Sequence, residues 1–278
     1  MRLDDARRSI EGTTRLVGII GSPVSHSLSP RMHNAAFAEL ELDWAYVPLP
    51  VSAAAVGDAV SGLRGLGLAG ANVTIPHKQA VLEYCDVVEP SAARSCSANT
   101  LLVDDGSIIA ASTDGEGVAA GLEPTGASCV VLGAGGASRP VIVALSDAGA
   151  ATITIAGRRP EAAAALASEL GAVCSGSAIR ADQLWPPATR ADIVVNATPI
   201  KDETLVALSS DQQIVDLAYR TDGAPTAFIA AARSAGCERI IDGLEFLVRQ
   251  GALSFERWTG QSAPLDVMRA AVMPSLGG

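Results

Sequence analysis

Short polar side chains stand at the ends of several expected strands in the first half of the sequence. They fall in the stretches "SHSLSP", "NVT", "ANT" and "STDG", and they are Ser27, Ser29, Asn72, Thr74, Asn99, Thr113 and Asp114. Taken singly, each suits a helix cap or a turn. Together, at the edge of one sheet, they would form a pocket of hydroxyls, amides and one carboxylate, which suits a small polyhydroxylated ligand.

Lys78 follows the same strand in "NVTIPHK". Pro76 ends the strand, and we expect a helix from about His77. A cation near the start of a helix lies on the unfavourable side of the helix dipole. A solvated surface charge and a functional placement both remain open at this point.

A glycine-rich turn, "VVLGAGGASRP", lies between a strand and a helix in the second half. Gly133, Gly135 and Gly136 let the backbone turn tightly and approach a pyrophosphate at the helix N-terminus, although Ser138 replaces the third glycine of the usual fingerprint. An ordinary tight turn is the alternative. The strand before the turn and the helix after it favour dinucleotide binding.

The end of the following strand indicates which dinucleotide would bind. An acidic residue there takes the ribose 2′-hydroxyl of NAD, but this strand leads into Gly157, Arg158 and Arg159. Two guanidinium groups suit a 2′-phosphate, although ordinary surface arginines are the alternative. The basic pair in an acidic chain favours NADP as the cofactor.

The strands and helices that would hold these residues predict an α/β protein. Apolar runs predict strands at 15–21, 44–51, 68–75, 191–200 and 212–219, with a hairpin over 98–113 turned at Asp105 and Gly106. Helical spacing follows at 29–40, and a strand, turn, helix, strand and helix follow from Ser128. A short strand and a long helix occupy 237–260. The 278 residues favour two domains.

Composition narrows the class of protein. The net charge is −10 and the pI is about 4.8, which disfavours nucleic acid as a partner. Five scattered cysteines and three histidines without shared spacing (His26, His33 and His77) favour reduced thiols and no metal site. No signal peptide and no membrane-spanning run is apparent, so we expect a cytoplasmic protein.

Seven motifs stand in the order and spacing of the shikimate dehydrogenase family, which the sequence resembles from about residue 15 to 262. The motifs are "GSPVSHSLSP", "GANVTIPHK", "ANTL", "STDGEG", "VLGAGGAS", "VDLAY" and "DGLEFLVRQGALSFERWTG". The resemblance implies NADPH-dependent, reversible reduction of 3-dehydroshikimate to shikimate in aromatic amino acid biosynthesis. It also implies an N-terminal substrate and catalytic domain (1–117), a Rossmann-type NADP domain (118–242) and C-terminal helices that return to the first domain (243–278).

The resemblance also implies roles for individual residues. Lys78 and Asp114 match the catalytic pair, which would supply the proton that hydride addition to a ketone requires. The residues that match substrate ligands are Ser27 and Ser29, for the carboxylate, with Thr74, Asn99, Tyr219 and Gln250. The residues that match the cofactor site are Gly133, Ala134, Gly135, Gly136, Ala137 and Ser138 for the diphosphate, Arg158 and Arg159 for the 2′-phosphate, and Thr198 and Gly243 on the nicotinamide side.

The sequence departs from the family at three places. "GRR" replaces Asn-Arg-Thr, "NATPIKD" lacks the usual Gly-Met, and "DGLEF" replaces Asp-Gly-Leu-Gly-Met. The alternatives are a quinate or aminoshikimate dehydrogenase of the same family, or a non-catalytic sensor of a shikimate-like ligand. Retention of both Lys78 and Asp114 disfavours the sensor. A monomer and a homodimer are both compatible with the sequence.

Overall fold

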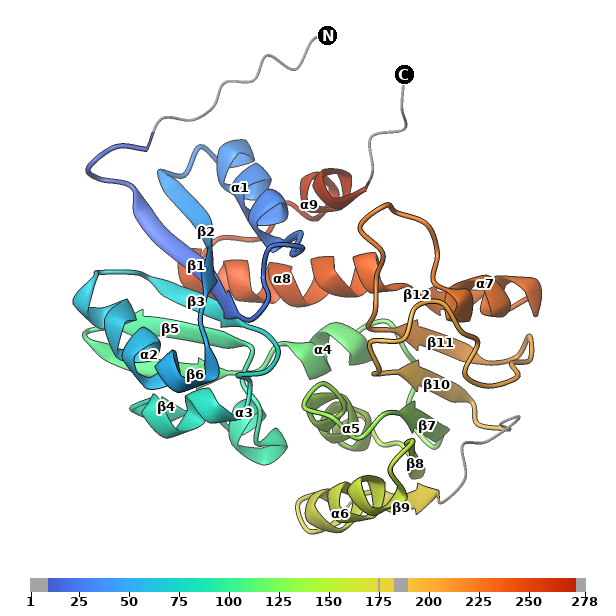
Figure 1. Ribbon diagram of the computed structural model, residues 1–278. Helices are drawn as coiled ribbons and strands as arrows, with labels where there is room; N and C mark the ends of the chain where they lie inside the picture. The colour runs from blue at the N-terminus through green and yellow to red at the C-terminus, as the bar shows by residue number, and fades with distance from the viewer. Residues whose placement is uncertain (1–9, 175, 183–189, 274–278) are drawn as a thin grey trace, which may run out of the picture.

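The computed structural model describes residues 10–174, 176–182 and 190–273. Residues 1–9 of the expected substrate domain (1–117) and 274–278 of the expected C-terminal segment (243–278) lie outside the described residues. The described residues form two six-stranded sheets, each with its own helices, and helices α4 (Asp114–Ala119) and α8 (Gly243–Thr259) connect the two parts (Figure 1). This arrangement confirms the predicted α/β fold class.

The first sheet mixes parallel and antiparallel pairs in the order β2-β1-β3-β5-β6-β4. Its strands are β1 (Arg15–Gly21), β2 (Trp44–Pro50), β3 (Gly70–Val73), β4 (Val87–Val88), β5 (Thr100–Asp104) and β6 (Ser107–Ala111), and its helices are α1 (Ser29–Glu39), α2 (Val56–Gly65) and α3 (Pro90–Ser95) with the 3₁₀ helices η1 (Ala53–Ala55) and η2 (Ala80–Tyr84). The predicted hairpin turns at Asp105 and Gly106, which both have positive φ, as a tight two-residue turn requires.

The second sheet is parallel throughout, in the order β12-β11-β10-β7-β8-β9. Its strands are β7 (Ser128–Leu132), β8 (Thr152–Ala156), β9 (Ala178–Asp182), β10 (Ile193–Asn196), β11 (Gln213–Asp216) and β12 (Arg239–Ile241), and its helices are α5 (Ser138–Asp147), α6 (Pro160–Gly171) and α7 (Ala227–Ser234). The order reverses between β7 and β10, and in such sheets ligands bind beyond the carboxyl ends of the strands at that point.

Three further helices follow the two sheets or join them. They are α4 (Asp114–Ala119), α8 (Gly243–Thr259) and α9 (Leu265–Val272). In Figure 1, α8 runs from β12 to the side of the first sheet where α1 and α9 lie. Asp242 caps α8 by accepting hydrogen bonds from the N–H groups of Leu244 and Glu245, so the long helix expected within 237–260 begins directly after Asp242.

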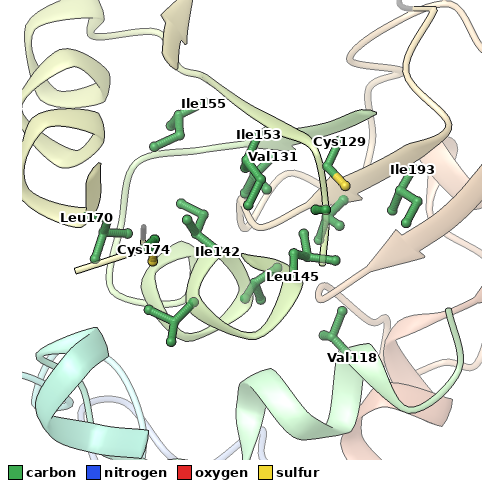
Figure 2. Close-up of a cluster of buried hydrophobic side chains, with 14 of the residues drawn as sticks. Val118, Cys129, Val131, Ile142, Leu145, Ile153, Ile155, Leu170, Cys174 and Ile193 are labelled. Carbon is green, nitrogen blue, oxygen red and sulfur yellow. The ribbon is translucent and has the colours of Figure 1, made fainter. Parts of the chain in front are cut away.

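Aromatic side chains are concentrated in one of the cores. The core between β7, β8 and α5 consists of Val, Ile, Leu, Ala and Cys side chains such as Val131, Ile142 and Ile153 (Figure 2). The core beneath α1 and α8 instead holds Phe37, Trp44, Tyr46, Phe255 and Trp258. The two C-terminal helices therefore complete the core of the first sheet.

One predicted element was wrong. No α-helix begins at His77; the chain makes a turn through Lys78 and then forms the 3₁₀ helix η2. The Lys78 carbonyl, which an α-helix would pair with Leu82, accepts a hydrogen bond from the Ala98 N–H at 2.8 Å. The expected helix dipole is therefore absent at Lys78.

Candidate active site

A cavity of about 180 Å³ lies where the strands of the first sheet end beside α4 and α8. We call it the polar cavity. It is lined by Ile19, Ser27, Ser29, Asn72, Val73, Thr74, Ile75, Lys78, Asn99, Asp114, Ala137, Leu217, Tyr219, Phe246, Leu247 and Gln250. All eight residues that the sequence predicts for the catalytic pair and the substrate line this one cavity.

Lys78 and Asp114 form a close ion pair in the polar cavity. Lys78 Nζ lies 2.6 Å from Asp114 Oδ2, and the side chains are 16% and 4% exposed. Asp114 is the first residue of α4, so the pair joins the η2 turn to the helix that follows the first sheet. An ammonium at a cavity wall can donate a proton to a bound group, and the neighbouring carboxylate fixes its position.

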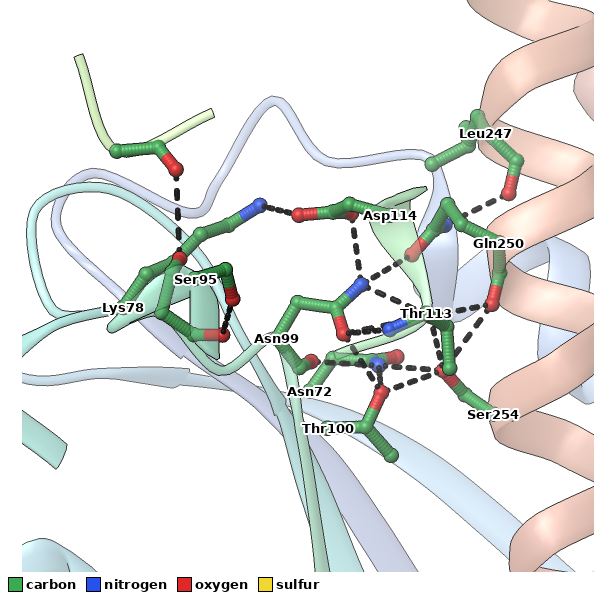
Figure 3. A network of polar contacts seen from close by, with 12 residues as sticks. Asn72, Lys78, Ser95, Asn99, Thr100, Thr113, Asp114, Leu247, Gln250 and Ser254 are labelled. Atoms are coloured by element: carbon green, nitrogen blue, oxygen red, sulfur yellow. Dashed lines mark hydrogen bonds and ion pairs between the residues drawn. The ribbon is translucent and has the colours of Figure 1, made fainter. Parts of the chain in front are cut away.

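Asn99 is the centre of a buried hydrogen-bond network (Figure 3). Its Nδ2 donates to Asp114 Oδ1 at 2.7 Å and to Gln250 Oε1 at 3.2 Å. Its Oδ1 accepts from the Thr113 N–H at 2.8 Å and from the Thr100 hydroxyl at 3.0 Å. One amide therefore orients the Asp114 carboxylate and Gln250 together.

Sequence reasoning missed Ser254 on α8. Its hydroxyl contacts Thr100 Oγ1 at 2.8 Å and accepts from Asn72 Nδ2 at 3.0 Å. Ser254 is fully buried and lies one turn after Gln250. Two polar residues four apart on an otherwise apolar helix face are a signal that could have located it.

Three hydroxyls meet at the start of α1. Ser27 Oγ accepts the Ser29 N–H at 3.2 Å, so Ser27 also satisfies one N–H group at the start of this helix. Ser29 is 4% exposed. Burial raises the pKa of Tyr219, which keeps its hydroxyl protonated as a hydrogen-bond donor. This end of the cavity therefore offers donors to an anion.

The second cavity lies at the switch point of the parallel sheet and has a volume of about 420 Å³. We call it the glycine-loop pocket. It is lined by Gly133, Ala134, Gly135, Gly157, Arg158, Arg159, Ala162, Ala197, Thr198 and Pro199. Gly133 has a φ of +112°, and a Cβ there would meet Thr198 Cγ2 at 3.1 Å, so glycine suits both its backbone and its surroundings.

The donors of this pocket fit a phosphorylated dinucleotide. Arg158 and Arg159 both line it, and neither forms an ion pair with a carboxylate of the described residues. Two unpaired guanidiniums beside a glycine turn suit a ligand that carries phosphate groups.

Four predicted cofactor residues lie outside the lining of the glycine-loop pocket. The Ser138 hydroxyl donates to the Gly133 carbonyl at 2.8 Å and so closes the loop. The Gly136 carbonyl accepts from the Ser97 hydroxyl, and Ala137 lines the polar cavity. Gly243 packs against Ala218, where a Cβ would lie 2.1 Å from the carbonyl oxygen.

A buried carboxylate supports the loop that carries Thr198. Asn196 Oδ1 accepts from the Thr198 N–H and hydroxyl, and Asn196 Nδ2 donates to Asp216 Oδ1 at 2.8 Å. Burial raises the pKa of Asp216 to about 6, and its hydrogen bonds with Thr226, Ala218 and Asn196 oppose that rise.

The histidines contribute no ligands to either cavity. His33 is fully buried, stacks on Tyr46 and has no hydrogen-bond partner at either ring nitrogen. Burial lowers its pKa to about 3. Within the described residues, no group of histidines, cysteines and carboxylates has the arrangement of a metal site, and no helix is long and apolar enough to cross a membrane.

Three stretches of the chain match known protein families. Residues 19–101 match the shikimate dehydrogenase substrate binding domain, 120–222 the shikimate / quinate 5-dehydrogenase family, and 243–273 the shikimate 5′-dehydrogenase C-terminal domain. A shikimate dehydrogenase (NADP⁺) of Moorella thermoacetica is 38% identical, with 96% of each chain covered.

Solved structures agree with this assignment. A shikimate dehydrogenase in complex with NADP⁺ matches with a TM-score of 0.86 and 34% identity, covering 95% of this chain and 96% of that one. The Thermus thermophilus shikimate 5-dehydrogenase in complex with NADP(H) and shikimate matches with a TM-score of 0.82 and 34% identity, covering 93% and 98%. The predicted resemblance is confirmed, and the chain belongs to the shikimate dehydrogenase family.

Proposed function

We propose that this protein catalyses the reversible, NADPH-dependent reduction of 3-dehydroshikimate to shikimate, a step of aromatic amino acid biosynthesis. The observation that carries the proposal is the Lys78–Asp114 pair, which lies in one cavity with six further residues that match substrate ligands of the family. The likeness to NADP-dependent relatives over nearly the whole chain supports the same reaction.

The polar cavity would bind shikimate through the carboxylate and through the hydroxyl groups of its ring. The hydroxyls of Ser27, Ser29 and Tyr219 would donate to the carboxylate. Thr74, Asn99 and Gln250 would bind the ring hydroxyls, because each offers a polar side chain at the cavity wall. The buried hydrogen bonds of Asn99 hold these groups in place before the substrate binds.

Lys78 would carry the proton. In the reductive direction its ammonium donates a proton to the oxygen of the ketone as the carbonyl carbon receives a hydride, so that the C=O bond becomes a C–OH group. Asp114, bonded to the ammonium at 2.6 Å, holds the donor at the cavity wall and stabilises its charge before transfer. In the oxidative direction the lysine amine accepts the proton of the alcohol.

The glycine-loop pocket would hold the cofactor. Bound NADPH supplies the hydride for the reduction. The turn at Gly133, Ala134 and Gly135 would approach the diphosphate, and Arg158 and Arg159 would pair with the 2′-phosphate. Gly136, Ala137 and Ser138 would shape that turn, with Thr198 and Gly243 on the side of the nicotinamide.

The remaining assignments are proposals of the same kind. We take residues 1–117 as the substrate and catalytic domain, 118–242 as the NADP domain and 243–278 as the returning C-terminal helices. The protein would act in the cytoplasm, as a monomer or a homodimer, on a small-molecule substrate.

The test is steady-state kinetics with shikimate and quinate, each with NADP⁺ and with NAD⁺. We expect the highest kcat/KM for shikimate with NADP⁺. A higher kcat/KM with quinate would identify a quinate dehydrogenase of the same family. Tight binding of shikimate without turnover by either cofactor would identify a sensor.

A further inference from the structure

Lysine is rare in this chain. Lys78 and Lys201 are the only lysines among 20 basic residues; all the others are arginine. Lys78 belongs to the polar cavity. Lys201 lies in "NATPIKD", one of the three places where the sequence departs from its family. A chain that uses arginine almost everywhere has thus kept a compact ammonium at two positions, and both lie near the same cavity.

Lys201 is held beside a wall of the polar cavity. Its Nζ lies 5.9 Å from the centre of the Tyr219 ring, and Tyr219 lines the cavity. The Lys201 carbonyl accepts the Ala227 N–H at 2.8 Å. The next residue, Asp202, forms an ion pair with Arg220, which follows Tyr219. The hydrogen bond to the Lys201 carbonyl and the Asp202–Arg220 ion pair therefore keep the lysine next to Tyr219.

The polar cavity lacks a net charge of its own. The charged side chains that line it are Lys78 and Asp114, which neutralise each other. The anion-binding end offers only the hydroxyls of Ser27, Ser29 and Tyr219, in a chain whose net charge is −10. An entering carboxylate would thus meet hydrogen-bond donors but an unfavourable overall field.

Lys201 can correct that deficit because its charge is not already compensated. Among the described residues, no carboxylate lies within ion-pair distance of its ammonium. The side chain is only partly exposed, so water screens its charge less than it screens a fully exposed one.

We infer that Lys201 is a specificity-determining residue, whose ammonium supplies the positive charge that favours a ring carboxylate over a neutral ring at the Ser27–Ser29–Tyr219 end of the polar cavity. This inference rests on the proposed function, because it names how that site selects its substrate class. The flexible lysine stem also lets the charge follow the substrate as it enters.

The test compares Lys201→Gln, Lys201→Arg and a control, Arg64→Gln, which removes the same charge from α2, away from the cavity. In Lys201→Gln the KM for shikimate should rise roughly three- to tenfold, with kcat and the KM for NADP⁺ nearly unchanged. Lys201→Arg should restore most of the loss. The control should leave all three parameters unchanged.

Two further measurements separate the effect of the Lys201 charge from that of its side-chain shape. The KM for the methyl ester of shikimate, which is neutral, should not respond to Lys201→Gln. The KM of the unmodified protein for shikimate should rise with salt more steeply than that of Lys201→Gln, because salt screens the ammonium.

The outcomes distinguish this inference from the function on which it rests. An unchanged KM for shikimate in Lys201→Gln, or an equal rise for the ester, would overturn the role of Lys201 and leave the proposed function intact. A rise only in the KM for NADP⁺ would assign the lysine to the cofactor instead. If the unmodified protein neither bound nor oxidised shikimate, both the proposed function and the inference would fail.

Discussion

In the polar cavity, the Asn99 amide donates hydrogen bonds to both Asp114 and Gln250, so these groups are already paired within the protein. In the glycine-loop pocket, Arg158 and Arg159 have no carboxylate partner among the described residues. The first site is built from segments as far apart as Ser27 and Gln250, whereas most of the second comes from one strand, turn, helix and strand. Changes in the polar cavity should therefore affect chemistry and stability together, and changes in the glycine-loop pocket should affect selectivity alone.

The largest effect should come from Lys78→Ala. We expect kcat for shikimate oxidation to fall about a hundredfold or more, because proton transfer belongs to the transition state, while KM changes less. Thermal unfolding should be measured in parallel, since the variant leaves Asp114 buried without its cation. A near-normal kcat would mean that Lys78 serves only to neutralise Asp114.

The double change Ser27→Ala/Ser29→Ala should have the next largest effect. Losing two hydrogen bonds to a carboxylate, at roughly 1.5–3 kcal/mol each, should raise the KM for shikimate strongly and leave the KM for NADP⁺ unchanged. The free energy of unfolding should fall only slightly, by about 0.5–2 kcal/mol, because Ser27 also satisfies an N–H of α1. Lower stability with an unchanged KM would show that these serines are only structural.

Arg158→Asp tests the glycine-loop pocket. The ratio of kcat/KM for NADP⁺ over NAD⁺ should fall about tenfold or more, because a charge-assisted hydrogen bond is lost and a carboxylate repels the 2′-phosphate. The melting temperature should not change, since Arg158 forms no ion pair with the residues that the structure describes. Arg180→Asp, at an exposed position of β9, is the matched control. Equal efficiency with NAD⁺ in the unmodified protein would contradict the assignment.

The smallest effect concerns two buried titratable side chains, His33 beside the first sheet and Asp216 in the second sheet. The pKa of His33 is about 3 in the folded protein instead of 6.5, so its contribution to stability is lost as the pH falls below about 6.5. The pKa of Asp216 is about 6 instead of 3.8, so the folded state binds its proton more tightly, and its contribution is lost as the pH rises from about 4 to 6.

The two groups therefore oppose each other under mild acid. Between pH 6 and pH 5, His33→Phe should lose about 1 kcal/mol less unfolding free energy than the unmodified protein, and Asp216→Asn about 1 kcal/mol more. Urea unfolding at the two pH values measures both. Identical pH profiles for all three proteins would show that neither group titrates as its burial predicts.

The contiguous part of the molecule was the easier part to predict. The turn at Gly133 lies within one strand–turn–helix, and its glycines and flanking apolar runs indicate the same structure locally. The segment at Lys78 gave the opposite result, because a hydrogen bond from Ala98 takes the carbonyl that a helix would need. Local patterns do not contain that competing contact.

Contacts between distant segments limited the prediction of the site in the same way. The sequence placed Gln250 only through its resemblance to a family, and it did not indicate that Ser254 would meet Asn72, 182 positions away. Asp216 is likewise an ordinary strand-end residue in the sequence. Its buried position becomes visible only when Asn196 and Thr226 are brought beside it.

Helix α8 has a consequence for how the chain is made. The core of the first sheet includes Val17 and Tyr46 from the beginning of the chain but also Val248, Phe255 and Trp258 from near its end. During synthesis, α8 must leave the ribosome before that core can close, whereas the parallel sheet ends earlier, at Ile241. Contacts of such long sequence separation form slowly, and an incomplete chain would expose the apolar face that α8 covers. The nascent protein thus exposes the apolar core of its first sheet until α8 has emerged, which makes the arrival of α8 the step that ends this exposure to aggregation.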